Sequence, residues 1–199
     1  MADRDDFLVT FDFGSVQRSA ERVRDLLFRL RAEFDLAPFE YCRKVRIAPL
    51  EIPYSHPEIT LGTWANDELS LLASYLHEQM HWYVTWYWQV RTEQWYDIFA
   101  DLRRRYARVP TRGPEGAPDE HSTYLHLVVN WLEIEVTSRF FDRERVIAHA
   151  AALPYYRWIC RTVIDDWQPL GALYAARGLV PVRPATGMSA ADLKLAGLG

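Results

Sequence analysis

The chain has too few cysteines and too few uninterrupted apolar residues for two broad classes of protein. Cys42 and Cys160 are the two cysteines in 199 residues, and neither belongs to a CxxC pair, so a disulfide framework is not expected. No apolar run of roughly 18 residues occurs, so no membrane span is predicted. The first six residues lack the apolar stretch of a signal peptide. We therefore expect a cytoplasmic protein.

The chain also lacks an excess of positive charge, whereas aromatic residues are abundant. The net charge is −4 and no basic stripe is present, so a nucleic-acid partner is not expected. The run Arg103, Arg104 and Arg105 is typical of a solvated helix face. Eight Trp and eleven Tyr residues indicate large aromatic walls, either in the core or around a pocket.

Length and patterning predict one α+β domain that is predominantly helical and has a small N-terminal sheet. A chain of 199 residues, 49% of them hydrophobic, suits a single domain with a substantial core. We expect residues 1–65 to hold strands and a helix, 66–180 to form a helical metal-binding part, and 181–199 to be a tail. Nothing in the sequence indicates the oligomeric state.

Periodicity and turn residues place the individual elements. Strands are predicted at 6–13, 43–49 and 58–64. Helices are predicted at about 16–34, 66–90, 93–108, 121–139, 142–151 and 155–167, with a short one running to about 177 after Pro169 and a turn of helix at 189–195. The stretch 109–120 is rich in Pro and Gly and must be a loop. This loop is either a plain surface connection or a flap that gates a site, and the sequence leaves both interpretations open.

The most informative motif is His77-Glu78-Gln79-Met80-His81, an HExxH pentapeptide inside the predicted 66–90 helix. Residues four apart lie on one helix face about one turn apart, which is the separation two imidazoles need to bind one Zn²⁺. Glu78 is rotated by roughly 100° from His77. We therefore predict His77 and His81 as metal ligands and Glu78 as the general base that takes a proton from water.

A catalytic zinc site normally has a third protein ligand, and the 121–139 helix offers one. His126, Asn130 and Glu133 share a face of that helix at i, i+4 and i+7. We predict Glu133 as the third ligand, with Glu135 as the runner-up, although exposed charges opposite a core stripe would look the same. His126 is then expected to stabilise a tetrahedral oxyanion or to be a ligand itself, and Asn130 to orient one of the histidines.

An HExxH helix followed by a Glu on a later helix resembles the gluzincin branch of the zincin metallopeptidases. The matching residues are His77, Glu78, His81 and Glu133, and the resemblance covers about residues 58–140. It implies a zincin-like fold in which the two histidines and the later Glu hold zinc. It also implies a strand at the rim of the cleft. Residues 58–63 are in the right place. As an edge strand they could pair with an extended peptide, and an ordinary core strand is the alternative. The third histidine of the metzincin motif is absent.

These observations predict a zinc hydrolase, most simply a metallopeptidase or a hydrolase that tailors a peptide or a small amide. Tyr155, Tyr156 and Arg157 follow Pro154, where a phenol or a guanidinium could steady the negative charge that develops on the attacked carbonyl. We predict Tyr155 for this role, with amphipathic packing of the helix as the alternative. One alternative is an oxidoreductase. Glu78 and His81 form half of a di-iron pattern, though no second ExxH stands on a convincing helix, and two His with one carboxylate can hold Fe²⁺. The other is a non-catalytic binding protein.

Overall fold

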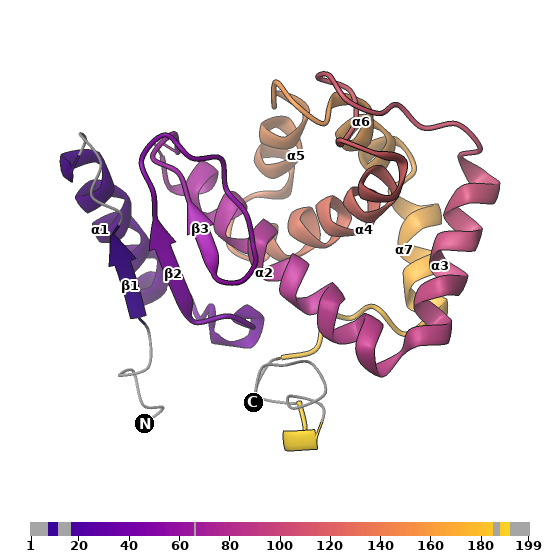
Figure 1. Ribbon diagram of the computed structural model, residues 1–199, viewed down its shortest axis with the longest axis horizontal. Coiled ribbons are helices and arrows are strands. Elements are labelled where there is room, and N and C mark those ends of the chain that lie inside the picture. The colour runs from indigo at the N-terminus through magenta and orange to yellow at the C-terminus, as the bar shows by residue number, and fades with distance from the viewer. Residues whose placement is uncertain (1–7, 12–16, 66, 185–187, 192–199) are drawn as a thin grey trace.

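A computed structural model describes residues 8–11, 17–65, 67–184 and 188–191 (Figure 1). The strands are β1 (Leu8–Phe11), β2 (Lys44–Ile47) and β3 (Ile59–Leu61). The helices are α1 (Gln17–Glu33), α2 (Glu68–Val90), α3 (Thr92–Arg105), α4 (Glu120–Thr137), α5 (Arg143–Ala151), α6 (Arg157–Asp165) and α7 (Trp167–Ala176), with a short 3-10 helix, η1 (Ala37–Phe39). The described residues are mostly helical and include a small sheet. This agrees with the predominantly helical α+β class that the sequence predicts.

Two expected helix starts are wrong, both near prolines. Helix α6 begins at Arg157, because Tyr156 takes the left-handed conformation (φ 54°, ψ 29°) and cannot be part of the helix. Pro169 does not break the chain, since it lies in the first turn of α7, where a missing N–H costs nothing. The predicted helical turn at 189–195 and the outer residues of the first strand fall mostly outside the described residues.

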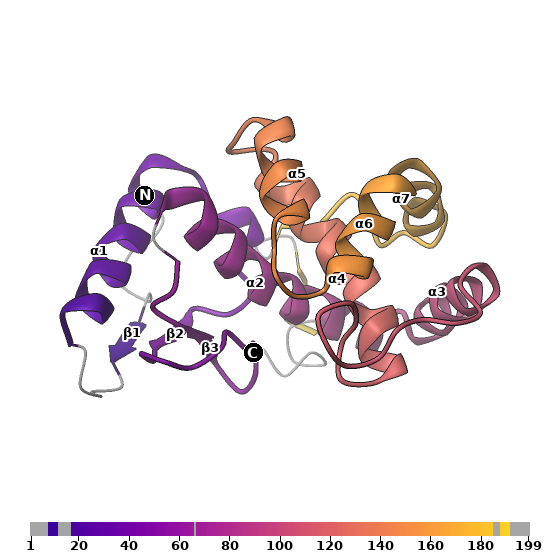
Figure 2. The ribbon, with the colours of Figure 1, turned by 90° about the horizontal axis from the view of Figure 1, so that it is seen from above.

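The strands form one parallel sheet in the order β1–β2–β3. Val9 lies opposite Val45, and Val45 lies opposite Ile59, so the apolar residues are in register across the sheet. Helix α1 connects β1 to β2 and packs against the sheet and α2 (Figure 2). A loop without a helix connects β2 to β3. The sheet and α1 therefore form one end of the molecule.

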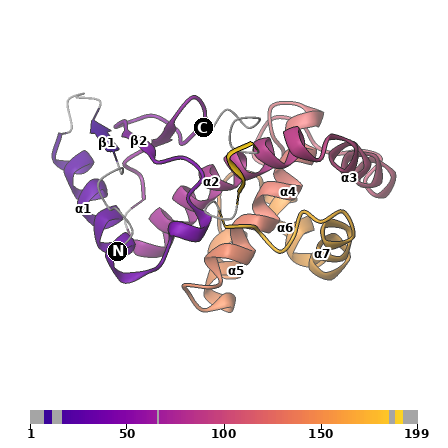
Figure 3. The ribbon, with the colours of Figure 1, turned by 90° about the horizontal axis from the view of Figure 1, so that it is seen from below.

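Helix α2 runs from the sheet to the helical end of the molecule, where α4 packs along it (Figures 1 and 3). Both helices are buried on most of their circumference, so polar side chains on their facing surfaces are enclosed. Helices α5 and α6 pack on α4, and α3 and α7 complete this end. Among the helices of the described residues, none has the length and apolar character that crossing a membrane requires.

Candidate metal centre

Helix α2 presents His77 and His81 side by side. Asp67 caps the helix by accepting a hydrogen bond from the backbone N–H of Ser70 (3.0 Å), and the helix then continues without a break through the motif. The Nε2 atoms of His77 and His81 are 3.2 Å apart. Two nitrogens bound to one tetrahedral Zn²⁺ at about 2.0–2.1 Å would be about 3.3 Å apart. The pair is therefore already spaced to share one ion.

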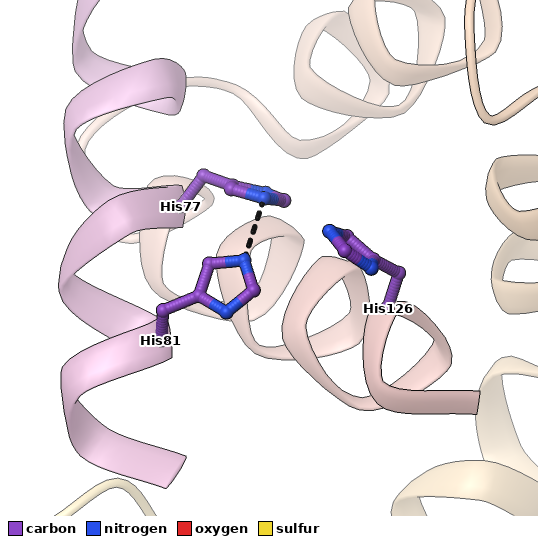
Figure 4. A group of neighbouring side chains, drawn as sticks. All are labelled: His77, His81 and His126. Atoms are coloured by element: carbon purple, nitrogen blue, oxygen red, sulfur yellow. Dashed lines mark hydrogen bonds between the residues drawn. The ribbon is translucent and has the colours of Figure 1, made fainter. Parts of the chain in front are cut away.

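Helix α4 contributes the third imidazole, from His126. Asp119 caps this helix through the backbone N–H of Ser122 (2.7 Å). The His126 ring centroid lies 5.6 Å from that of His77 and 5.1 Å from that of His81. One nitrogen from each of the three rings falls within 4.8 Å of the other two. Figure 4 shows the three rings turned toward one another between the two helices. We call His77, His81 and His126 the histidine cluster.

The other nitrogens of two of these rings are held by fixed acceptors. The Nδ1 of His77 lies 2.8 Å from Oε2 of Glu133, and the Nδ1 of His126 lies 2.7 Å from the backbone carbonyl oxygen of Ser122. A carbonyl or carboxylate at Nδ1 fixes the proton there, which leaves Nε2 with a free lone pair. Both rings are thus in the tautomer and the orientation that a metal ligand needs.

This arrangement favours His126 over Glu133 as the third ligand. Glu133 contacts His77 on the nitrogen opposite to the one that faces His81, so its carboxylate lies behind the ligand rather than beside an ion. His126, for which the sequence leaves open a ligand role or an oxyanion role, lies in the cluster. Glu135 is directed elsewhere, toward Arg139 at 3.8 Å.

Asn130 does not orient a histidine as the sequence had suggested. Its Nδ2 lies 3.5 Å from Sγ of Cys160 on α6, and its Oδ1 is buried without a hydrogen-bond partner. Burial raises the pKa of the Cys160 thiol to about 12, and the nearby charge of Glu133 adds to this shift. Cys160 is therefore a neutral thiol that packs behind the cluster.

Glu78 has the environment that a general base requires. Its side chain is buried, and this burial raises its pKa to about 7. The positive charge available on His77 opposes that shift, and the negative charge of Glu133 adds to it. A carboxyl group with a pKa close to neutral can both accept and release a proton during one reaction cycle.

The three imidazoles differ in how readily they are protonated. Burial lowers the pKa of His81, and it lowers that of His126 to about 4, with the neighbouring His77 adding to both shifts. Burial also opposes a charge on His77, but the hydrogen bond and negative charge of Glu133 outweigh it and raise the His77 pKa. His77 is therefore the ring whose proton competes with a metal ion.

Two tyrosines ahead of α6 stand beside the cluster. Tyr156 is the nearer, with its ring centroid 4.5 Å from that of His126. Tyr155, predicted to stabilise the oxyanion, packs against Tyr156 at 5.5 Å and is 52% exposed. Burial raises the pKa of both phenols, and the charge of Glu78 contributes to each shift. Both phenols are therefore near the general base, and Tyr156, the second phenol that the sequence offers after Pro154, is the one beside His126.

Gln79, inside the motif, belongs to a separate buried network on another side of α2. Its Oε1 accepts hydrogen bonds from the backbone N–H groups of Tyr41 (2.7 Å) and Cys42 (2.9 Å). Its Nε2 donates to the carbonyl of Cys42 and to the hydroxyl of Tyr75. The Tyr75 hydroxyl in turn donates to Glu40 (2.9 Å). No sequence pattern indicates this network, because most of its partners are backbone groups distant in the chain.

Comparison with protein-family models, with curated proteins and with solved structures finds no match to this chain. The chemistry of the site is therefore argued from its own geometry.

Proposed function

We propose that this protein is a metal-dependent hydrolase, with zinc as the simplest metal, that cleaves an amide or ester bond. The observation that carries the proposal is the convergence of one nitrogen each from His77, His81 and His126 within 4.8 Å. Three neutral imidazoles with an open fourth position are a common donor set for catalytic zinc. The acceptors at Nδ1 of two of these rings favour the same use.

Each residue of the site has a role in this proposal. A zinc ion held by the three histidines supplies a Lewis acid that lowers the pKa of water to about 7. Glu78 accepts the proton of the attacking water and passes it to the leaving group. Glu133 holds His77 in orientation through its Nδ1. Tyr156 or Tyr155 donates a hydrogen bond to the oxygen on which negative charge develops.

A distant zincin-like architecture forms part of the proposal. The HExxH helix α2 follows directly after β3, as the resemblance to gluzincins implies. The proposed ligand set differs from that of gluzincins, because His126 replaces Glu133 as the third ligand. The features shared with gluzincins are thus the HExxH motif on a helix and the strand before it. The proposed set of three metal ligands differs.

The test of this proposal is the Glu78→Gln variant, loaded with zinc and assayed against a panel of small amides and esters beside the parent. Removing the general base should lower kcat by roughly 10²- to 10⁴-fold. Zinc content should stay unchanged, because Glu78 is not a ligand. Glu68→Gln, an exposed change in the first turn of the same helix, is the matched control and should behave as the parent.

The alternatives give different results in the same experiment. A Gln variant as active as the parent would contradict the general-base role. Protein purified without added metal that carries iron and consumes oxygen would support the oxidoreductase. Zinc bound without turnover of any substrate in parent or variant would support a binding protein.

A further inference from the structure

The outer edge of β3, where an extended peptide would pair, is already occupied by the chain itself. The backbone N–H of Tyr54 donates to the carbonyl of Thr60 (3.1 Å), and the N–H of Thr60 donates to the carbonyl of Tyr54 (2.8 Å). Thr60 is the middle residue of three in β3. Its outward-facing donor and acceptor are therefore both used, and a substrate strand would have to displace this segment.

The segment that closes the edge is also attached to α2, next to the metal ligand His81. The indole Nε1 of Trp82 donates to the carbonyl of Ser55 (2.7 Å). The ring of His56 stacks on that of Trp82 at a centroid distance of 4.1 Å. These contacts place an aromatic rim on the β3 side of the histidine cluster.

On the opposite side, Tyr156 and Tyr155 form an aromatic wall. Tyr156 keeps a positive φ of 54°, a conformation that costs a residue with a side chain about 1 kcal/mol or more. It persists because the surrounding loop fixes the start of α6. The N–H of Arg157 donates to the carbonyl of Pro114 (2.9 Å), and the N–H of Trp158 donates to that of Glu115 (3.2 Å).

The loop that fixes the wall is itself held rigidly. Gly116 approaches Pro110 so closely that a Cβ would lie 2.0 Å from the Pro110 carbonyl oxygen. The Thr123 hydroxyl donates to that same carbonyl (3.0 Å) and accepts the N–H of Ala117 (3.1 Å). The loop is thus a fixed support for the tyrosine wall, and the alternative of a mobile flap is not favoured.

The charges around the cluster do not suit an acidic substrate. Glu78 and Glu133 place two carboxyl groups beside the imidazoles. The two arginines on the first turns of α6, Arg157 and Arg161, are both directed to Glu115, at 2.7 and 3.6 Å. A substrate carboxylate would therefore meet carboxyl groups rather than a guanidinium.

We propose that the substrate of this site is a small, uncharged acyl compound, an amide or an ester, and not an extended polypeptide. The inference rests on the proposed function, and it narrows the substrate class. The closed edge of β3 and the fixed tyrosine wall disfavour an extended chain, and Arg157 and Arg161 are paired with Glu115 rather than open to a carboxylate. Compact acyl groups remain.

The test uses the full chain loaded with Co²⁺, whose visible absorption changes when a ligand binds to the metal. Three hydroxamates with the same metal-binding group are titrated: acetohydroxamate, an N-acetylated trileucine hydroxamate, and the monohydroxamate of succinate, which carries a carboxylate. We expect acetohydroxamate to bind more tightly than either of the others by about tenfold or more. Because all three share one metal-binding group, the differences report access and charge.

Substitutions test whether the tyrosine wall is what keeps the longer hydroxamate from binding. Tyr155→Ala removes the exposed half of the wall and should narrow the gap between acetohydroxamate and the trileucine compound by about threefold or more. Tyr96→Ala, at a tyrosine that is 60% exposed on α3, should leave the gap unchanged.

The outcomes separate this inference from the proposed function. A trileucine hydroxamate that binds the parent as tightly as acetohydroxamate would overturn the small substrate, as would failure of acetohydroxamate to perturb the cobalt spectrum. Either result would leave the metal site standing. If Tyr155→Ala leaves the difference in affinity between the two hydroxamates unchanged, the proposed role of the tyrosine wall is wrong. Failure of the parent to bind Co²⁺ would instead contradict the proposed function, and the inference would fall with it.

Discussion

Two buried clusters of polar side chains form against helix α2. They differ in how completely their hydrogen-bonding atoms have partners. One is the network of Gln79, Tyr75, Glu40 and Arg31, and the other is the histidine cluster with Glu78 and Glu133. In the network, the guanidinium of Arg31 donates to both oxygens of Glu40, at 2.6 and 2.8 Å, and Tyr75 donates a third hydrogen bond. In the cluster, one nitrogen from each of three imidazoles lies within 4.8 Å of the other two, without a carboxylate or guanidinium among them.

The difference separates a structural role from a functional one. Buried polar groups with complete partners fix how α2 sits on the segment around Tyr41 and Cys42. Burying polar atoms that lack a hydrogen-bond partner is unfavourable. Such atoms are therefore found where a bound metal ion or ligand supplies the missing partner. Glu40, which packs against α2, and Glu78, which is part of α2, are both buried, and only Glu78 belongs to the group that a ligand could complete.

The largest expected effect on stability comes from the network of Gln79, Tyr75, Glu40 and Arg31. Glu40→Gln removes the charge opposite Arg31, whose side chain is 23% exposed, and should lower the free energy of unfolding by about 2–3 kcal/mol. Urea unfolding measures this loss. Zinc affinity should not change. Glu51→Gln, which breaks the exposed pair with Arg46, is the control and should lower the free energy of unfolding far less. A parallel loss of zinc affinity in Glu40→Gln would mean that the two groups are not separate.

The next effect is on metal binding. Glu133→Gln removes the charge behind His77 and should weaken zinc binding by about 10- to 100-fold, measured by competition with a chelator. Because Glu133 raises the pKa of His77, the variant should also retain its metal to a lower pH, relative to its own maximum. Glu135→Gln, two residues along and directed to Arg139, is the matched control. Equal losses in both variants would contradict the role of Glu133.

A third effect is the cost of burying Glu78. Its pKa is raised from 4.5 to about 7, so the folded state holds this proton more tightly than the unfolded state. The stabilisation is present below pH 4.5 and is lost as pH rises to about 7. Metal-free Glu78→Gln should therefore exceed the parent in stability by about 1–2 kcal/mol at pH 8, and the advantage should vanish near pH 4. Urea unfolding at both values tests this. An advantage that does not depend on pH would show that Glu78 ionises normally.

The smallest effect distinguishes the two tyrosines. Tyr156→Phe keeps the ring beside His126 and removes only the hydroxyl, so kcat should fall by about 2- to 10-fold, the range of one neutral hydrogen bond. Tyr155→Phe, at the exposed ring, should have less effect. Steady-state kinetics on one small ester or amide compares the two. A larger loss in Tyr155→Phe would return the oxyanion role to Tyr155.

Much of the fold was predictable because it depends on local signals. The absence of Gly and Pro from 64 to 108 and the cap at Asp67 predict α2 and its motif, and periodicity predicts α4. The third ligand was not predictable in the same way. His126 and Glu133 share a face of α4 and are about 10 Å apart along its axis. Which of them lies level with the α2 histidines depends on how the helices are offset, and periodicity carries no information about that offset.

Two other features escaped prediction for the same reason. The left-handed backbone of Tyr156 depends on hydrogen bonds to Pro114 and Glu115, which are about forty residues away in the chain. The pairing of Tyr54 with Thr60 closes the edge at which, by the resemblance to gluzincins, an extended peptide could pair. Backbone hydrogen bonds outside the regular helices and strands decide both features, and both bear on what can enter the site.

The most direct test of the central claim is the zinc content per chain, measured by elemental analysis on the parent, His126→Ala and Glu133→Ala, all equilibrated at the same low free zinc concentration. Our account predicts about one zinc in the parent, a large loss in His126→Ala and a partial loss in Glu133→Ala, because two imidazoles alone hold zinc weakly. Full zinc in His126→Ala with none in Glu133→Ala would contradict it and would make Glu133 the third ligand.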